Sequence, residues 1–155
     1  MKRHLLAAAS MILVAFPGTP LLAQPQSVEL KGDVKVVRVV GEGDEKHEEL
    51  QEPTRVVPGD RLAFSTRYIN SGAEPAEDFV VTNPLPSAVM LAEDGSFDVS
   101  VDGGKTYGHL ASLEVANGDS GSRPATLADV THVRWTLARI APGAQGSLTY
   151  FAVVR

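Results

Sequence analysis

The sequence predicts an all-β fold of two packed antiparallel sheets with Greek-key connections. Three observations support this fold class. Apolar and polar residues alternate with a period of two, clusters of Gly, Pro, Asn and Asp separate the runs, and helical spacing is almost absent beyond residue 23. Because sheets packed face to face bury one side of each strand, this pattern favours a β-sandwich of seven to eight strands. A β-barrel is the nearest alternative.

The first 23 residues have the pattern of a secretory signal peptide. A basic start at 1–4 precedes an apolar stretch at 5–16, which as a helix spans roughly 18 Å and is too short for the ~30 Å hydrocarbon core. We expect cleavage after Ala23, with 24–155 forming one domain in the periplasm or at the cell surface. No transmembrane segment is expected after cleavage.

Composition argues against several function classes. The chain has no cysteine, which excludes a disulfide scaffold and a Cys-ligated zinc or iron–sulfur site. Its 19 acidic residues against 14 Lys and Arg give a formal charge of −5, which disfavours nucleic acid as a partner. Loss of the leader removes Lys2 and Arg3 and makes the remaining chain more acidic. No cofactor is predicted.

The first expected strand, 28–40, changes phase part-way. Its first half carries an apolar face and a charged face. The apolar set is Val28, Leu30, Val34 and Val36, and the charged set is Glu29, Lys31, Asp33 and Lys35. From Val37 the apolar positions shift by one, which indicates a bulge or a change of sheet. The charged, glycine-punctuated segment 41–52 is expected to be a loop leading to a short extended piece at 54–57.

The middle of the chain predicts short strands between turns. Pro58–Gly59 is the core of a tight turn, since Pro fixes one backbone angle and Gly accepts a positive one. Pro84 and Pro86 cannot donate to a strand ladder, so 83–86 is expected to be a rigid connector. The expected strands are 62–70, 78–82, 88–91 and 96–102.

The last third contains the least regular segment. We expect a short strand near 110–113, a loop at 117–122 and one helical turn within 124–129. Val133, Trp135 and Leu137 then alternate with polar residues, which predicts a strand with Trp135 in the core. The final strand, 146–155, is apolar on both faces, so it is expected to be covered on both sides or paired with something outside the chain.

Four consecutive motifs resemble those of one bacterial family. Segments 56–60, 62–70, 70–76 and 79–86 contain Pro-Gly-Asp, a strand with a tyrosine, Asn-Ser-Gly and an Asn-Pro-Leu-Pro corner. Their order and spacing resemble the DUF11 domain, a repeat module of bacterial surface proteins, and a looser similarity continues over 133–143. The resemblance implies an immunoglobulin-like β-sandwich in the cell envelope, without defined catalytic residues. Asn83 stands where the family usually has Asp, and a single copy is present.

The residues expected to matter most are structural, because they fix the corners and the core. They are Pro58, Gly59, Asp60, Asn70, Gly72, Pro84, Pro86 and Trp135.

The acidic segment raises a calcium hypothesis, since hard cations prefer several oxygen ligands. The candidate ligands are Glu42, Asp44, Glu45, Glu48 and Glu49, with Glu52 nearby. Their spacing matches no defined calcium loop. A solvated hairpin tip, whose charge discourages aggregation of adjacent edge strands, is the favoured interpretation.

No catalytic residue is predicted. Three widely separated histidines follow the leader, His47, His109 and His132, without zinc-binding spacing, and Gly-x-Ser-x-Gly is absent. The segment 100–107 resembles the Asp-box of sialidase-type propellers, but a single copy is interpreted as a turn that Asp102 stabilises. A small secreted hydrolase therefore remains an alternative that no sequence motif supports.

The leading hypothesis is a non-enzymatic interaction protein that binds or assembles through strand edges or loops. The two terminal strands, 28–40 and 146–155, either pair inside the domain or exchange strands with a protein partner by β-augmentation. Pairing inside the domain is the favoured arrangement, because terminal strands of sandwiches usually close their sheets.

Overall fold

The structure, a computed structural model, describes residues 28–118 and 121–155. The expected leader, 1–23, lies outside the described residues. The described part is all-β, and every strand pair is antiparallel. The predicted all-β antiparallel class is thus confirmed. Ten strands are present rather than seven to eight, because short strands formed in segments expected to be loops.

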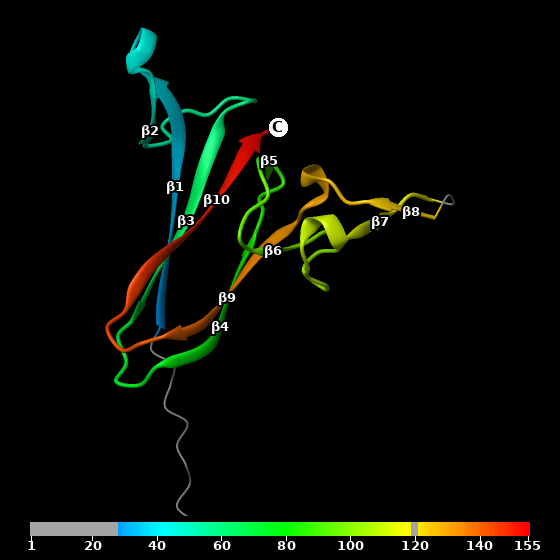
Figure 1. The fold of residues 1–155 in the computed structure, drawn as a ribbon. Coiled ribbons are helices and arrows are strands. Elements are labelled where there is room, and N and C mark those ends of the chain that lie inside the picture. Colours follow the sequence, from blue (N-terminus) through cyan, green and yellow to red (C-terminus); the bar gives the residue numbers. More distant parts are fainter. Residues whose placement is uncertain (1–27, 119–120) are drawn as a thin grey trace, which may run out of the picture.

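The strands form a five-stranded sheet, a three-stranded sheet and a two-stranded hairpin (Figure 1). In spatial order the first sheet is β2 (His47–Gln51), β1 (Val28–Val40), β3 (Arg61–Asn70), β10 (Gln145–Val154) and β5 (Val89–Leu91). The second is β4 (Ala76–Pro84), β9 (His132–Ile140) and β6 (Asp98–Ser100), and the hairpin is β7 (Glu114–Ala116) with β8 (Ser122–Pro124). The 3₁₀ helices are η1 (Gly43–Glu45), η2 (Leu110–Ser112) and η4 (Leu127–Asp129).

One hydrophobic core joins the two larger sheets. Leu62 and Tyr150 from the first sheet and Val133 and Trp135 from the second are buried in the same cluster. The Trp135 ring lies 6.2 Å from that of Tyr150 and 5.4 Å from that of Phe97, measured between ring centroids. The alternating apolar residues of β3, β9 and β10 therefore point into the space between the sheets.

The pairing of β1 differs from the bulge or change of sheet that the phase shift at Val37 predicted. The strand remains in one sheet, pairing with β3 over 28–36 and with β2 from Val36 to Val40. Val36 and Val37 are both buried, so the shift marks a change of partner strand rather than of sheet. The prediction of a loop over 41–52 is wrong in part, because η1 and β2 form there, and 54–57 forms no strand.

β4 is longer than predicted. It continues through Asn83 and Pro84, which pair with Val133 and His132 of β9. Pro84 is tolerated because β4 is an edge strand, where a missing N–H need not interrupt a ladder. The rigid connector is therefore confined to the following residues, where the Leu85 amide donates to the Thr131 carbonyl at 2.8 Å.

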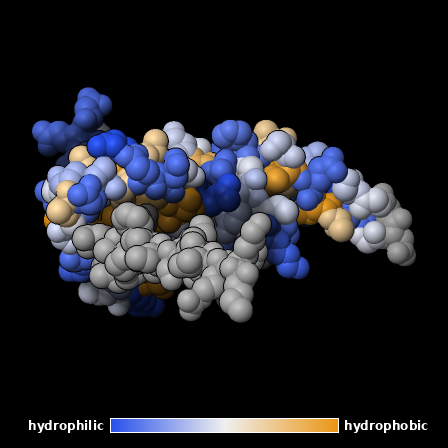
Figure 2. Space-filling view, turned by 90° about the horizontal axis from the view of Figure 1, so that it is seen from below, coloured by the Kyte–Doolittle hydropathy of each residue, from blue (hydrophilic) through white to orange (hydrophobic). Residues whose placement is uncertain are grey.

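The segment 108–130 is only partly as expected. The predicted strand at 110–113 is instead η2, and the β7–β8 hairpin replaces a simple loop. The helical turn within 124–129 is confirmed as η4, which Thr126 and Asp129 close with a capping box. Figures 1 and 2 show this hairpin projecting away from the two larger sheets.

The prediction that β10 is covered on both faces is confirmed only in part, because Ser147 and Thr149 on the face away from the core are exposed. Tyr150 and Ala152 lie in the core at 2% and 0% exposure. On the opposite face the Arg61 guanidinium lies 4.2 Å from the centre of the Phe151 ring, a cation–π contact. Both terminal strands flank β3, so they pair inside the domain.

Candidate functional site

The Pro58–Gly59 turn is tied to β1 through Asp60. The Asp60 amide donates to the Val57 carbonyl at 3.0 Å, and Gly59 adopts a φ of +92°, which only glycine accepts readily. The Asp60 carboxylate accepts hydrogen bonds from the Arg38 guanidinium and from the Val57 amide. These contacts, that of Arg38 above all, lower the pKa of Asp60. The turn thus anchors the start of β3 to β1.

Asn70 joins the two connections that link the sheets. Its side-chain amide donates to the carbonyls of Ile140 and Glu74, both at 2.9 Å, and its side-chain oxygen accepts from the Gly72 amide at 3.0 Å. Asn70 is 1% exposed. The β3–β4 and β9–β10 connections are therefore held together by a single buried side chain.

A second polar contact crosses between the sheets. The Asn83 side-chain amide of β4 donates to the Thr66 hydroxyl of β3 at 2.7 Å, and Thr66 is buried. Asn83 has a donor here that an aspartate carboxylate lacks. The carbonyl of Pro86, the last residue of the connector, accepts a hydrogen bond from the Val89 amide at 3.0 Å and so closes the turn into β5.

Asp102 organises the hairpin turn that follows β6. Its carboxylate accepts hydrogen bonds from the amides of Lys105 and Thr106 and from the hydroxyls of Ser100 and Thr106. These donors, led by the Thr106 amide, hold the pKa of Asp102 well below its ordinary value. Ser100 is fully buried beside this turn.

An Asp102→Asn variant is expected to be less stable than the parent at neutral pH, and the gap is expected to narrow as the pH falls below ~4. A carboxyl whose pKa is lowered by folding stabilises the native state above its unfolded pKa of ~4 and loses this effect as the pH falls. Thermal melts of both proteins between neutral pH and pH ~3 measure the gap. A gap that stays constant across this range contradicts the assigned role.

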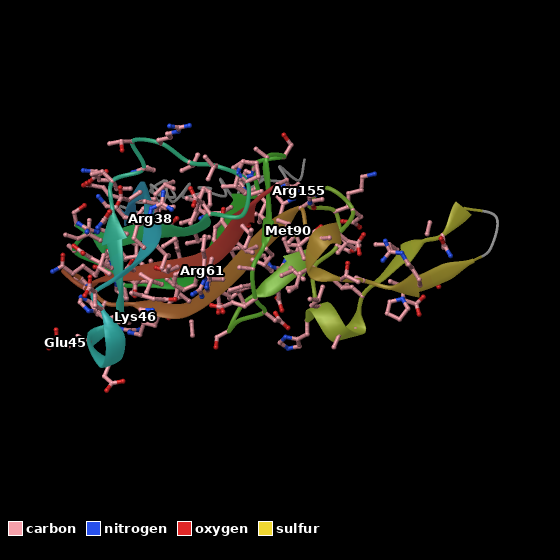
Figure 3. The ribbon with its side chains drawn as sticks, turned by 90° about the horizontal axis from the view of Figure 1, so that it is seen from above. Arg38, Glu45, Lys46, Arg61, Met90 and Arg155 are labelled. Carbon is pink, nitrogen blue, oxygen red and sulfur yellow. The ribbon has the colours of Figure 1, made fainter. Side chains whose placement is uncertain are left out.

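The calcium candidates are spread over a tip and an edge strand rather than gathered. Figure 3 shows Glu45 and Lys46 at the turn between β1 and β2. Glu48 binds Arg61 at 3.2 Å and Glu52 binds Lys35. Within 28–118 and 121–155, no group of three or more His, Asp or Glu side chains is arranged to hold a metal ion.

Millimolar calcium is expected to leave the melting temperature unchanged. Glu48 faces a cation already, and Glu42, Asp44 and Glu45 belong to the exposed η1 turn. A ligand that binds only the native state must raise its stability, so a thermal melt with and without calcium measures binding. A concentration-dependent rise would support the calcium hypothesis against this expectation.

Two histidine rings in the described ranges make hydrogen bonds, and neither bonds a serine side chain. The Nδ1 atom of His47 contacts the Glu45 carbonyl and that of His132 contacts the Thr131 hydroxyl, each at 3.0 Å. Among these residues, the Ser112 hydroxyl donates to the backbone carbonyl of His109 at 2.7 Å, but no histidine ring is hydrogen-bonded to a serine hydroxyl.

The two larger sheets leave parts of their strand edges unpaired. β1 pairs only with β3 before Val36, and β4 pairs only with β9 along its length. An open groove lies between these two edges, lined by Leu30, Val34, Phe64 and Pro84 among others. Sequence reasoning pointed to the terminal strands but could not show which edge is open, because pairing partners are set by the folded topology.

On the other side of the core, parts of β10 and β9 also lack a neighbouring strand. β10 pairs with β5 only from Ala152 onward, and β9 pairs with β6 only up to Arg134. Between them lies a groove that includes Phe97, Trp135 and Leu148. The domain therefore presents strand edges on both sides of its core.

Comparison with family models, with curated proteins and with solved structures found no match. Over the described residues, no helix is long and apolar enough to span a membrane.

Proposed function

We propose that this chain is an exported, non-enzymatic, immunoglobulin-like module of the bacterial cell envelope, of the DUF11 type, that binds a protein partner through a strand edge. The observation that carries the proposal is the open outer side of β1 over 28–35, within a domain whose shared core is filled by side chains. Unpaired backbone N–H and C=O groups on an edge accept an added strand by β-augmentation.

Export rests on the leader pattern of 1–23, and the absence of cysteine does not argue against it. A domain of this size buries enough surface to fold without disulfides, so it suits an oxidising compartment without needing them. The acidic balance and the edge charges support a protein partner in preference to nucleic acid.

Site-specific photo-crosslinking in intact cells tests this function. A photoreactive residue is placed at Lys31, on the open edge of β1, or at Thr136, on the exposed face of β9 as a control. The proposal expects a discrete crosslinked protein species from position 31, none from position 136, and an exported chain whose N-terminal residue is Gln24. A chain that keeps its leader in the cytoplasm, or crosslinks equally from both positions, would contradict it.

A further inference from the structure

The outer side of β1 is free over a defined length. β3 occupies one side of this strand from Val28 to Val36, while β2 begins to pair with the other side only at Val36. In the described ranges, no turn or loop makes a backbone hydrogen bond to 28–35. The free stretch is thus long enough for one more strand.

This stretch is complementary to itself when two copies run antiparallel and Gly32 lies opposite Gly32. Lys31 of each copy then faces Asp33 of the other, and Glu29 faces Lys35. Symmetry makes each of these opposite-charge pairs occur twice. On the other face of the strand, Leu30 lies opposite Val34.

Registers displaced from this one are less favourable. Centring the pair on Lys31 places Lys31 opposite itself and Glu29 opposite Asp33. Centring it on Asp33 places Asp33 opposite itself and Lys31 opposite Lys35. Directly opposed like charges destabilise a strand pair. A slip of one strand by a single residue sets charged residues opposite apolar ones. Centring the pair on Leu30 or on Val34 keeps two opposite-charge pairs but shortens the overlap of the free stretches. The Gly32 register, with four such pairs, is therefore the most favourable.

The side chains at this edge are disposed for such pairing. Leu30 is 48% exposed, and its burial against Val34 would remove apolar surface from water. Lys31 and Glu29 belong to no ion pair formed within the described residues, although Glu29 accepts a hydrogen bond from the Ser71 hydroxyl. Lys35 contacts Asp33 and Glu52 in the monomer, so pairing requires it to exchange these partners for Glu29 of the other copy. No atom lies within 4 Å of the place where a Gly32 Cβ would stand. The centre of the register is therefore unobstructed.

The free edge of β10 is a poorer fit to a second copy. Its residues from Gln145 to Phe151 carry no charge that would select one register. Residues 93–97 line a cavity together with Thr149 and Tyr150 and so lie beside this edge. The Ala92 amide, moreover, already donates to the Phe151 carbonyl at 2.8 Å.

From these observations we infer that the partner of the β1 edge is a second copy of this chain. The two β1 strands pair antiparallel about a two-fold axis at Gly32, which joins two five-stranded sheets into one continuous sheet. This inference rests on the proposed function and names the partner for it.

A charge swap tests the register on the full chain. Lys31→Glu places a second carboxylate opposite Asp33 in both symmetry-related pairs, and it is expected to raise the dimer Kd by about tenfold or more. In the monomer Lys31 faces Arg67 of β3, so the same change adds no repulsion within the fold. The double variant Lys31→Glu with Asp33→Lys is expected to restore the parent Kd, and Lys46→Glu at the hairpin tip serves as the control of equal charge.

Sedimentation equilibrium over roughly 1–200 μM measures these constants, a range that suits an interface of small area. Circular dichroism of each variant checks that the fold is retained. A parent that remains monomeric across this range, or a double variant as impaired as Lys31→Glu, overturns the inference.

A single cysteine gives an independent readout, because the native chain has none. Residues directly opposite in an antiparallel pair have Cα atoms roughly 4.5–5.5 Å apart, within the span of a disulfide. Gly32→Cys is expected to give a disulfide-linked dimer under mild oxidation, whereas Glu77→Cys on the edge of β4 is expected to remain monomeric. Equal yields from both positions contradict the assigned axis.

The outcomes separate this inference from the proposed function. A monomeric parent whose position 31 crosslinks a different envelope protein in cells refutes self-pairing and leaves edge binding in place. A dimer with the predicted register in a chain that is never exported supports self-pairing and refutes the envelope role.

Discussion

Replacing Trp135 with alanine is expected to lower the free energy of unfolding by about 3–5 kcal/mol. The indole is 8% exposed and contacts Phe97 from the segment before β6 and Tyr150 from the opposite sheet. Its removal leaves a cavity where the two sheets meet, and the surrounding strands, held by their ladders, cannot collapse into it fully. Urea unfolding followed by circular dichroism measures the loss.

Thr136→Ala is the matched control for this change, because it lies next along β9 with its side chain exposed. Surface substitutions of this kind usually alter stability by less than about 0.5 kcal/mol. If Trp135→Ala unfolds at the same urea concentration as the parent, Trp135 does not hold the two sheets together and the packing described above is wrong.

Replacing Asn70 with alanine is expected to cost roughly 3 kcal/mol, since buried backbone groups left without partners carry a penalty of about 1–3 kcal/mol each. The carbonyls of Ile140 and Glu74 and the amide of Gly72 all lose their hydrogen bond to this side chain. Because these groups belong to both connections, the sheets are expected to separate at this end first. Amide exchange of Gly143, which donates to the Asn70 carbonyl at 2.8 Å, should accelerate.

The comparison variant is Asn117→Ala, whose side chain is exposed beside the β7–β8 hairpin. A stability loss of similar size in both variants would mean that the Asn70 network has no special role. An unchanged exchange rate at Gly143 in the Asn70 variant would lead to the same conclusion.

The sequence predicted the fold class because period-two alternation is strong in the long strands. β3, β9 and β10 each have a buried face and clear turn residues at their ends, so local pattern and topology agree. The turns at Pro58–Gly59 and at Asp102 were also predictable, because their geometry depends on residues close in the chain.

The missed elements lack these local signals. β2 is exposed along its whole length, so its sequence, His47–Gln51, has no apolar face to reveal a strand, and only pairing with β1 makes it one. β7 and β8 are short and largely exposed for the same reason. The sequence did point to Asn70 as a corner residue, but not to the carbonyl of Ile140, seventy residues further along the chain, as its partner.

The candidate site at the β1 edge could likewise be predicted only in part from the sequence. Alternating charges on 28–35 are visible in the sequence, and their self-complementarity could be found by writing the segment against itself. Whether that edge is open depends on where β2 begins to pair, which is a property of the fold. Edge strands are thus the part of this molecule where sequence and topology must be considered together.

The central claim is that the space between the two sheets is filled by side chains and that the domain binds its partner through the open edge of β1. Residue-resolved amide hydrogen exchange tests this claim most directly. The account predicts that the amides of Leu62 and Val133, in strands with neighbours on both sides, exchange slowly at every protein concentration. Every second amide within 28–35 should exchange quickly in dilute solution and slowly once the edge is occupied. Core amides that exchange as fast as those of 52–57, or protection within 28–35 that never changes, would contradict it.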